Sequence, residues 1–292
     1  MSVDYAAAQL FNGLASGAFY ALLALGLSVI FGMLRVINFT HGALFMLGAF
    51  ATYYGAEAFH VPFYAALVVA PLAVGLFGMA IEVTILRRLR GLDPVYGLLM
   101  TFALTLIIVN VVRLMAGPLG SPYSAPDALS GATNLGFTVY PTYRLFVIAV
   151  SLAISLLVWW FVERSTLGAR VRAATENPVL ARAFGVDTNL LITLTFGVGA
   201  GIAALAGVLA APTTNVAPSM GDAIIIYTFA IVVIGGLGSI TGSIVAGFAL
   251  GLLQAIGSVY YPPISTTLIF IVMVLVIIVR PAGLFGKPEE FR

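Results

Sequence analysis

Charge is the scarcest property of this 292-residue chain. Only 8% of its residues are Asp, Glu, Lys or Arg, whereas 61% are hydrophobic and the mean hydropathy is +1.11. A soluble core of this size could not hide that much apolar surface, so the solvent around the protein must be lipid. Cysteine is absent, which excludes disulfides and thiol chemistry without indicating a compartment. Only two histidines, His41 and His60, occur, at unrelated positions, so we expect no metal site.

Several functional classes are excluded by residues that are missing. The sole lysine, Lys287, is followed by Pro288, so no Gly-x-x-x-x-Gly-Lys-Ser/Thr phosphate loop exists. We therefore expect that this chain does not itself hydrolyse ATP through such a site. We also expect no cofactor on this chain and no nucleic-acid partner. No acidic residue falls near the middle of an apolar run; Glu57 and Glu82 lie near run ends. Ion-coupled transporters commonly need a membrane-embedded carboxylate, so this pattern argues against that class. No Ser/His, His/Glu or paired-carboxylate arrangement indicates an enzyme.

Uncharged runs predict the membrane segments, because a spanning helix needs about 20 mostly apolar residues. The longest run, 223–279, is divided by Gly235–Ser239 and by Pro262-Pro263 into three segments, the first of them short. The runs are continuously apolar instead of alternating, which favours helices over a barrel. We predict an all-α, polytopic helical membrane protein with about eight or nine crossings, some of them broken or re-entrant, in a single domain over residues 1–292. The predicted segments are 5–34, 36–56, 58–81, 94–112, 145–162, 188–221 and those near 223–234, 242–257 and 264–280.

The basic residues predict the orientation. If the loop 163–187 is cytoplasmic, alternation of the spans leaves only Arg113 and Arg144 of the 13 basic residues on the outer side. The N-terminus then lies outside and the C-terminus in the cytoplasm. The start bears Asp4 and no basic residue, which also argues against a cleaved signal peptide. The basic residues placed inside, apart from those of the loop, are Arg35, Arg87, Arg88, Arg90, Arg280, Lys287 and Arg292.

The loop 163–187 contains seven charged residues in a chain that is otherwise poor in charge, and we call it the charged segment. Within it, Asn177 is a good N-cap, Pro178 suits the first helical position and Gly185 suits a left-handed end, so a short helix over 178–184 is predicted. Its apolar face suits a groove in a cytosolic partner, but an amphipathic helix lying on lipid is an alternative. The candidate docking residues are Arg170, Arg172, Glu176, Asn177, Pro178, Arg182 and Gly185.

Two breaks in the apolar runs are candidates for the translocation path or gate. At the first, Asn38, Thr40 and His41 bring polar groups to a helix start, which suits either a carboxylate or simple capping of the next helix. The second is a glycine-rich turn that serves as a tight cytoplasmic turn or as a hinge beside a pathway. Its candidate residues are Gly235, Gly236, Gly238 and Ser239.

Small residues and one long loop complete the pattern. Three Gly-x-x-x-Gly repeats begin at Gly13, Gly197 and Gly247, and each allows close approach of neighbouring helices in a compact bundle.

The loop 117–143 contains four prolines, and two interpretations stay open for it: an ordered cap or partner contact at the outer mouth, and a passive surface connection.

Seven motifs follow one another along the chain in a specific order and spacing. They are Asn12-Gly13, Ile37 to Gly42, Ile81-Glu82 with Arg87 and Arg90, Gly168-Ala169-Arg170 through Asp187, Ala206 to Leu209, Gly235 to Ser239 and Arg280 to Gly286. With these motifs the chain closely resembles, over nearly its whole length, the inner-membrane permeases of branched-chain amino acid-type ABC importers, and among them the shorter permease of each pair. The family usually has Arg after the residue matching Glu82, and then Tyr-Arg-Pro, whereas this chain has Val83 and Leu86-Arg87-Arg88, which puts a role for that cluster in doubt.

The resemblance implies a subunit of a larger importer in a bacterial inner membrane. Its expected partners are a sister permease, two cytosolic ABC ATPases that hold ATP and magnesium, a periplasmic substrate-binding protein and the lipid bilayer. The residues 163–188 would then form the cytoplasmic coupling loop. The expected cargo is a branched-chain or other hydrophobic amino acid, or a related small solute such as an amide, urea or an aromatic acid. A secondary transporter or channel that acts alone is the alternative function.

Overall fold

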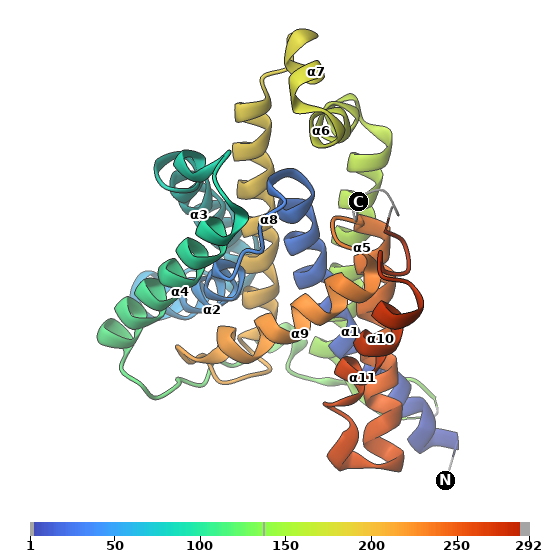
Figure 1. Ribbon diagram of the computed structural model, residues 1–292. Coiled ribbons are helices and arrows are strands. Elements are labelled where there is room, and N and C mark those ends of the chain that lie inside the picture. The colour runs from blue at the N-terminus through green and yellow to red at the C-terminus, as the bar shows by residue number, and fades with distance from the viewer. Residues whose placement is uncertain (1–2, 137, 287–292) are drawn as a thin grey trace. The chain divides into compact units, whose positions relative to one another are not determined.

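The computed structural model describes residues 3–136 and 138–286, and it is almost entirely helical (Figure 1). Each of the nine apolar segments predicted from the sequence forms an α-helix, which confirms a polytopic helical membrane protein. These helices are α1 (Val3–Leu34), α2 (Thr40–Phe59), α3 (Phe63–Thr84), α4 (Pro94–Ala116), α5 (Thr142–Arg164), α8 (Thr188–Ala210), α9 (Met220–Gly235), α10 (Ile240–Tyr260) and α11 (Leu268–Val279).

The connections contain shorter elements. Two helices lie within the charged segment, α6 (Thr166–Glu176) and α7 (Pro178–Ala183), and the sequence predicted only the second. A small antiparallel hairpin in the 117–143 loop pairs Thr133 with Tyr140. The remaining elements are the 3₁₀ helices η1 (Leu86–Leu89), η2 (Asp127–Leu129) and η3 (Pro262–Ile264), and the strands β1 (Ala132–Asn134) and β2 (Val139–Pro141).

Among the described helices, six are long and apolar enough to cross a membrane. They are α1, α3 with η1, α4, α5, α8 and α10. At a rise of 1.5 Å per residue, the 16 residues of α9 and the 12 of α11 extend only about 24 and 18 Å. A bilayer core is about 30 Å thick, so neither helix spans it alone. The shortness of α9 agrees with the prediction for residues 223–234.

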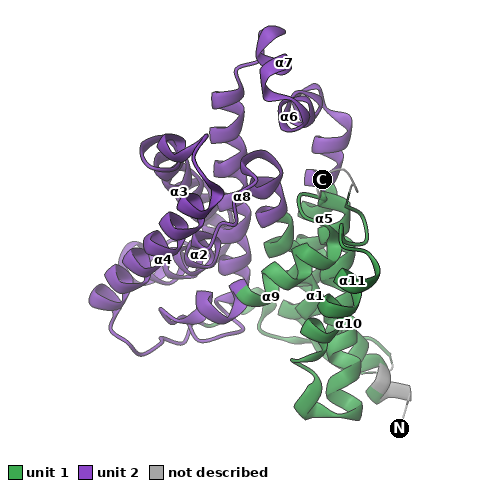
Figure 2. Cartoon of the chain, viewed as in Figure 1, with its two compact units in different colours: residues 1–25, 124–156, 226–292 green, residues 26–123, 157–225 purple. Residues whose placement is uncertain are grey.

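The chain divides into two compact units (Figure 2). Unit 1 comprises residues 1–25, 124–156 and 226–292, and unit 2 comprises residues 26–123 and 157–225. Three of the four boundaries fall inside α1, α5 and α9, so these helices contribute residues to both units, and the fourth lies in the 117–143 loop. A single membrane domain over the whole chain stays a prediction.

In unit 1, the repeats on α1 and α10 pack against each other. A Cβ atom on Gly13 would lie 2.9 Å from Leu252 Cα, and one on Gly17 would lie 2.9 Å from Phe248 Cα. From the other side, a Cβ on Gly251 would overlap the backbone of Gly17. The two repeats therefore serve tight helix packing, in which the absence of side chains lets the backbones touch.

In unit 2, α8 is the central helix and packs against α2 and α3. The third repeat lies here: a Cβ on Gly201 would lie 3.1 Å from the carbonyl oxygen of Pro71 in α3, and one on Gly197 would strike Met79. Ala203 and Ala206 of α8 are completely buried, whereas Val198 on the same helix is half exposed. The largely apolar α8 thus forms the core of the unit that contains the charged segment.

Candidate functional site

The charged segment folds into two capped helices. Ser165 starts α6 by accepting a hydrogen bond from Gly168 N at 2.9 Å, and Asn177 Oδ1 starts α7 by accepting one from Leu180 N at 2.9 Å. Pro178 occupies the first helical position of α7, and Gly185 follows its end with a φ of 80°. The start and stop predicted from the sequence are confirmed, although the helix ends one residue early, at Ala183.

The two faces of α7 differ in burial. Ala181 is buried in a small cluster with Ala174 of α6 and Leu191 of α8. Val179 and Phe184, in contrast, are 75% and 80% exposed. The small alanine therefore attaches α7 to its own unit, and the large apolar side chains predicted to form a docking face remain uncovered in this chain.

Polar contacts attach α6 to the end of α1. Arg35 donates from its Nη2 to the carbonyl oxygen of Thr175 at 3.3 Å, and the Thr175 hydroxyl lies 3.0 Å from Met33 Sδ. On α6 itself, Arg172 donates to the Val162 carbonyl at the end of α5 and lies 3.7 Å from the Glu163 carboxylate. The segment is thereby held by the ends of the flanking membrane helices.

The other predicted docking residues lie on the surface of the same two helices. Arg170 and Glu176 are exposed on α6, and Arg182 is exposed on α7, where its Nε donates to the Pro178 carbonyl at 3.2 Å. All seven predicted residues therefore belong to one continuous helical pair, and the caps Asn177 and Gly185 shape it.

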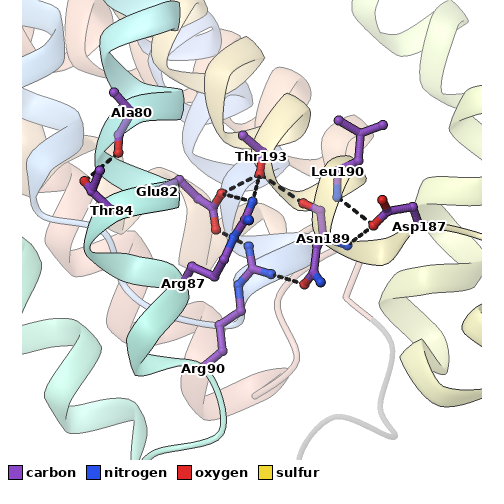
Figure 3. A network of polar contacts seen from close by, with 9 residues as sticks. All are labelled: Ala80, Glu82, Thr84, Arg87, Arg90, Asp187, Asn189, Leu190 and Thr193. Carbon is purple, nitrogen blue, oxygen red and sulfur yellow. Dashed lines mark hydrogen bonds and ion pairs between the residues drawn. The ribbon is translucent and has the colours of Figure 1, made fainter.

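A buried ion cluster joins α3 and η1 to α8, and Figure 3 shows it from close by. The Glu82 carboxylate is 0% exposed and is paired with Arg90, and also with Arg87 at 3.4 Å. The Thr193 hydroxyl donates to Glu82 Oε2 at 2.5 Å and accepts from Arg87 Nη2 at 2.7 Å. The carboxylate compensates two arginines at the end of a membrane helix, where an unpaired charge would be costly.

The cluster continues to the start of α8. Arg90 donates from Nη1 to Asn189 Oδ1 at 2.8 Å, and Asp187 caps α8 by accepting from the backbone N–H of Asn189 at 3.0 Å. Burial lowers the pKa of Arg90 from its ordinary value; the Glu82 carboxylate opposes this shift, whereas Arg87 and Arg182 add to it. Because α8 begins directly after α7, the cluster links the charged segment to the membrane helices.

Glu82 is absent from the residues proposed as functional from the sequence. Glu82 lies near the end of an apolar run, where a charged residue usually marks the end of a membrane segment. The residues that follow it also differ from the usual family pattern, which argued against a role for this cluster. The available signal was the presence of Arg87 and Arg90 within eight residues of a carboxylate in an apolar chain. That spacing does not reveal Thr193, which lies 111 residues away in sequence.

The first predicted break is buried. Asn38, Thr40 and His41 are 2%, 0% and 0% exposed, at the start of α2. Asn38 Oδ1 accepts a hydrogen bond from Thr40 N at 3.1 Å, which forms an Asx turn. The Thr40 hydroxyl donates to the Thr101 carbonyl of α4 at 2.9 Å. These hydrogen bonds attach the connection between α1 and α2 to α4.

The second predicted break is the turn between α9 and α10. Gly236 and Gly238 have φ values of 105° and 79°, which glycine adopts without strain, and Ser239 starts α10 by accepting from Gly242 N at 3.1 Å. The carbonyl of Gly235 accepts from Phe285 N at 3.0 Å, so residues near the end of the described chain lie on this turn. The geometry is that of the tight turn considered from the sequence, and a role as a gate stays a prediction.

A cavity of about 300 Å³ in unit 2 brings the two predicted groups together. Asn38, from the first break, and Pro178 and Arg182, from the charged segment, all line it, as do Arg35 and Arg90. Glycines 235, 236 and 238 and Ser239 are not among its lining residues. The cavity places the start of α7 beside the α1–α2 connection and the ion cluster.

The fold and the site define the class of protein. This is a multi-pass helical membrane protein with an exposed helical pair, which is held by contacts with the ends of α1, α5 and α8, and with a buried ion cluster that joins α3 and η1 to α8. The chain belongs to the family described as the permease component of the branched-chain amino acid transport system, whose model matches residues 9–279.

Individual relatives agree with this assignment. The chain is 30% identical to the high-affinity branched-chain amino acid transport system permease protein BraD of Pseudomonas aeruginosa, over 96% of both chains. It is 29% identical to the permease protein LivH of the system of the same name in Escherichia coli K12, again over 96% of both. The permease protein LivM of that same system is 26% identical, over 91% of this chain and 67% of LivM.

Proposed function

We propose that this chain is the shorter membrane permease of an ATP-driven importer of branched-chain amino acids or related small solutes. Membership in the permease family is the observation that carries the proposal. Similarity to both LivH and LivM, two permease proteins of one named system in one organism, supports a sister permease as partner. Two ABC ATPases and a periplasmic binding protein complete the proposed assembly.

In this proposal the charged segment receives the movement of the ATPases. Val179, Leu180 and Phe184 are 75%, 54% and 80% exposed, and a groove in a cytosolic partner would cover them. The buried Ala181 and the Arg35–Thr175 contact would transmit displacement of α7 and α6 to α8 and α1. Alternating access follows if ATP-driven closure shifts these helices. The segment lies in the cytoplasm, with the N-terminus outside.

Cross-linking tests the docking role directly, because the chain has no cysteine and single-cysteine variants therefore need no background removal. Phe184→Cys in the assembled transporter is expected to cross-link to an ATPase subunit. Leu119→Cys is the matched control: it is 82% exposed in the loop on the predicted outer side, and no cross-link to an ATPase is expected. Labelling of Phe184→Cys only by a lipid-soluble reagent would instead place α7 on the membrane surface.

Transport measurements test coupling. Reversing Arg182 to Glu, or replacing Gly185 at its φ of 80°, is expected to lower solute uptake and solute-stimulated ATP hydrolysis in proteoliposomes while membrane insertion stays intact. Normal uptake by both variants would contradict the docking assignment. Uptake by the purified chain alone, with no ATPase present, would favour a transporter or channel that acts by itself.

A further inference from the structure

Two residues that line the cavity of about 300 Å³ have a buried donor without a hydrogen-bond partner among the described residues. Asn38 is 2% exposed and lines the cavity, and its Nδ2 is buried without a hydrogen-bond partner among the described residues. Its Oδ1 accepts from Thr40 N, which establishes which end of the amide is the free donor. Arg90, a second lining residue, likewise has a buried Nε without a partner. Such groups cost free energy unless something accepts from them.

The charge of the lining is positive. Arg35 and Arg182 line the cavity beside Arg90, and their described hydrogen bonds go to backbone carbonyls and not to a carboxylate. Glu82 supplies one negative charge against the two positive charges of Arg87 and Arg90, so the ion cluster keeps a net positive charge, and Glu82 is not a lining residue. Asp93 is the one acidic residue among those that line the cavity; it is exposed, and one carboxylate oxygen accepts from Val95 N. Three arginines therefore line the cavity, of which only Arg90 is paired with a carboxylate, that of Glu82, and the one acidic lining residue, Asp93, is exposed.

The remaining surface limits the size and the polarity of the occupant. Ligand pockets commonly measure about 300–1,000 Å³, so this cavity suits a small molecule. Much of its wall is apolar, contributed by Leu34, Val36, Leu86, Leu89, Ile192 and Phe196. Guanidinium and amide donors above an apolar wall match a compact anion with a hydrocarbon portion.

We propose that this cavity is a binding site for a small aliphatic carboxylate, whose oxygens accept from Asn38 Nδ2 and from the surrounding arginines. Pro178 and Arg182 belong to α7, whereas Arg35 and Asn38 belong to the connection between α1 and α2. A bound carboxylate thus ties α7 to that connection and restrains its movement. In the assembled transporter it would lower ATP hydrolysis, a consequence that rests on the proposed coupling role of α7.

Calorimetric titration of the full-length chain in detergent tests binding without any partner. Isocaproate carries the carboxylate alone, L-leucine carries it with an amine, and L-leucinamide lacks it. Saturable binding of isocaproate that weakens as salt rises is expected, with no binding of L-leucinamide. Binding of L-leucine as well would identify amino acids as a source of the carboxylate, whereas binding of isocaproate alone would point to carboxylates without an amine.

Three variants locate the site. Asn38→Asp keeps the shape and the acceptor for Thr40 N but replaces the free donor with a repelling charge, so isocaproate affinity should fall by a factor of about 10–100, the value of a hydrogen bond to a charged group. Arg35→Gln should weaken it by about threefold or more. Arg88→Gln, an exposed arginine that does not line the cavity, is the matched control with unchanged affinity.

Several results would overturn the proposal. They are no isocaproate binding to the wild-type chain, binding of inorganic phosphate but not of isocaproate, and equal affinity in Asn38→Asp and Arg88→Gln. Loss of isocaproate binding on assembly with the ATPases would show that a partner residue fills the cavity instead. Because binding is measured without ATPases, its failure would leave the proposed transport function untouched.

Discussion

Replacing Glu82 with Gln should lower the free energy of unfolding by about 2–4 kcal/mol. Removing one member of a buried ion pair costs about 3–5 kcal/mol, because the remaining charge is left uncompensated. Here the carboxylate is 0% exposed, but the side chains of Arg87 and Arg90 are 38% and 22% exposed and can turn toward water, which reduces the cost. Gln has nearly the same volume, so no cavity contributes.

Thermal unfolding of the full-length chain in detergent measures the effect, with Trp159 and Trp160 as the fluorescent reporters. The midpoint for Glu82→Gln should fall by about 5–15 °C. Glu57→Gln makes the same chemical change at an exposed position on α2 and should shift it by about 1 °C or less. Equal midpoints for the two variants would refute the view that Glu82 holds the ion cluster together.

A double-mutant cycle isolates the contact across α3 and α8. Thr193→Val removes the hydroxyl that lies 2.5 Å from Glu82 Oε2 and keeps the shape of the side chain. Residues in one hydrogen-bonded cluster usually show coupling energies of about 0.5–3 kcal/mol, so the double variant should lose less stability than the sum of the single variants. Strict additivity would mean that Glu82 and Thr193 do not interact.

Three further substitutions test local packing and capping. Gly251→Ala should lower the free energy of unfolding by about 1–3 kcal/mol, because the added Cβ overlaps the α1 backbone. Gly131→Ala, with no atom within 4 Å of the new Cβ, should be nearly neutral in the same thermal unfolding measurements. Thr101→Val should cost about 1–3 kcal/mol in chemical unfolding, since the Phe39 N–H loses its hydroxyl acceptor. Asn177→Ala should weaken α7 by about 1 kcal/mol, and amide hydrogen exchange at Leu180 should accelerate; unchanged exchange would contradict the cap.

The charged segment shows how far local sequence signals reach. Asn177, Pro178 and Gly185 predict both ends of α7, because capping depends on residues within one turn of each other. The preceding α6 was not predicted, although Ser165 caps it: with four charged residues over 163–172 the stretch looks like a loop. Which side of α7 would be buried was also open, since Ala181 is inconspicuous in sequence and meets Leu191 only through the fold.

The apolar runs and the glycine repeats behave in a similar way. Their composition predicts that nine segments are helical and that some helices approach closely, but not which ones. The structure pairs Gly17 with α10 and Gly201 with Pro71 of α3. Such pairing depends on shape along whole helices, which no single repeat contains.

By itself, the sequence determined the lipid environment, the nine helical segments and the boundaries of α7, because composition, run length and capping act between neighbours in the chain. Only the tertiary structure decided that Glu82 meets Thr193 and that Asn38, Arg90 and Arg182 surround one cavity. The physical reason is that these contacts join residues far apart in sequence, and their meeting depends on how α8 packs against α2 and α3. The apolar face of α7 needed both sources: the sequence pattern predicted it, and the structure shows that the rest of the chain leaves it exposed.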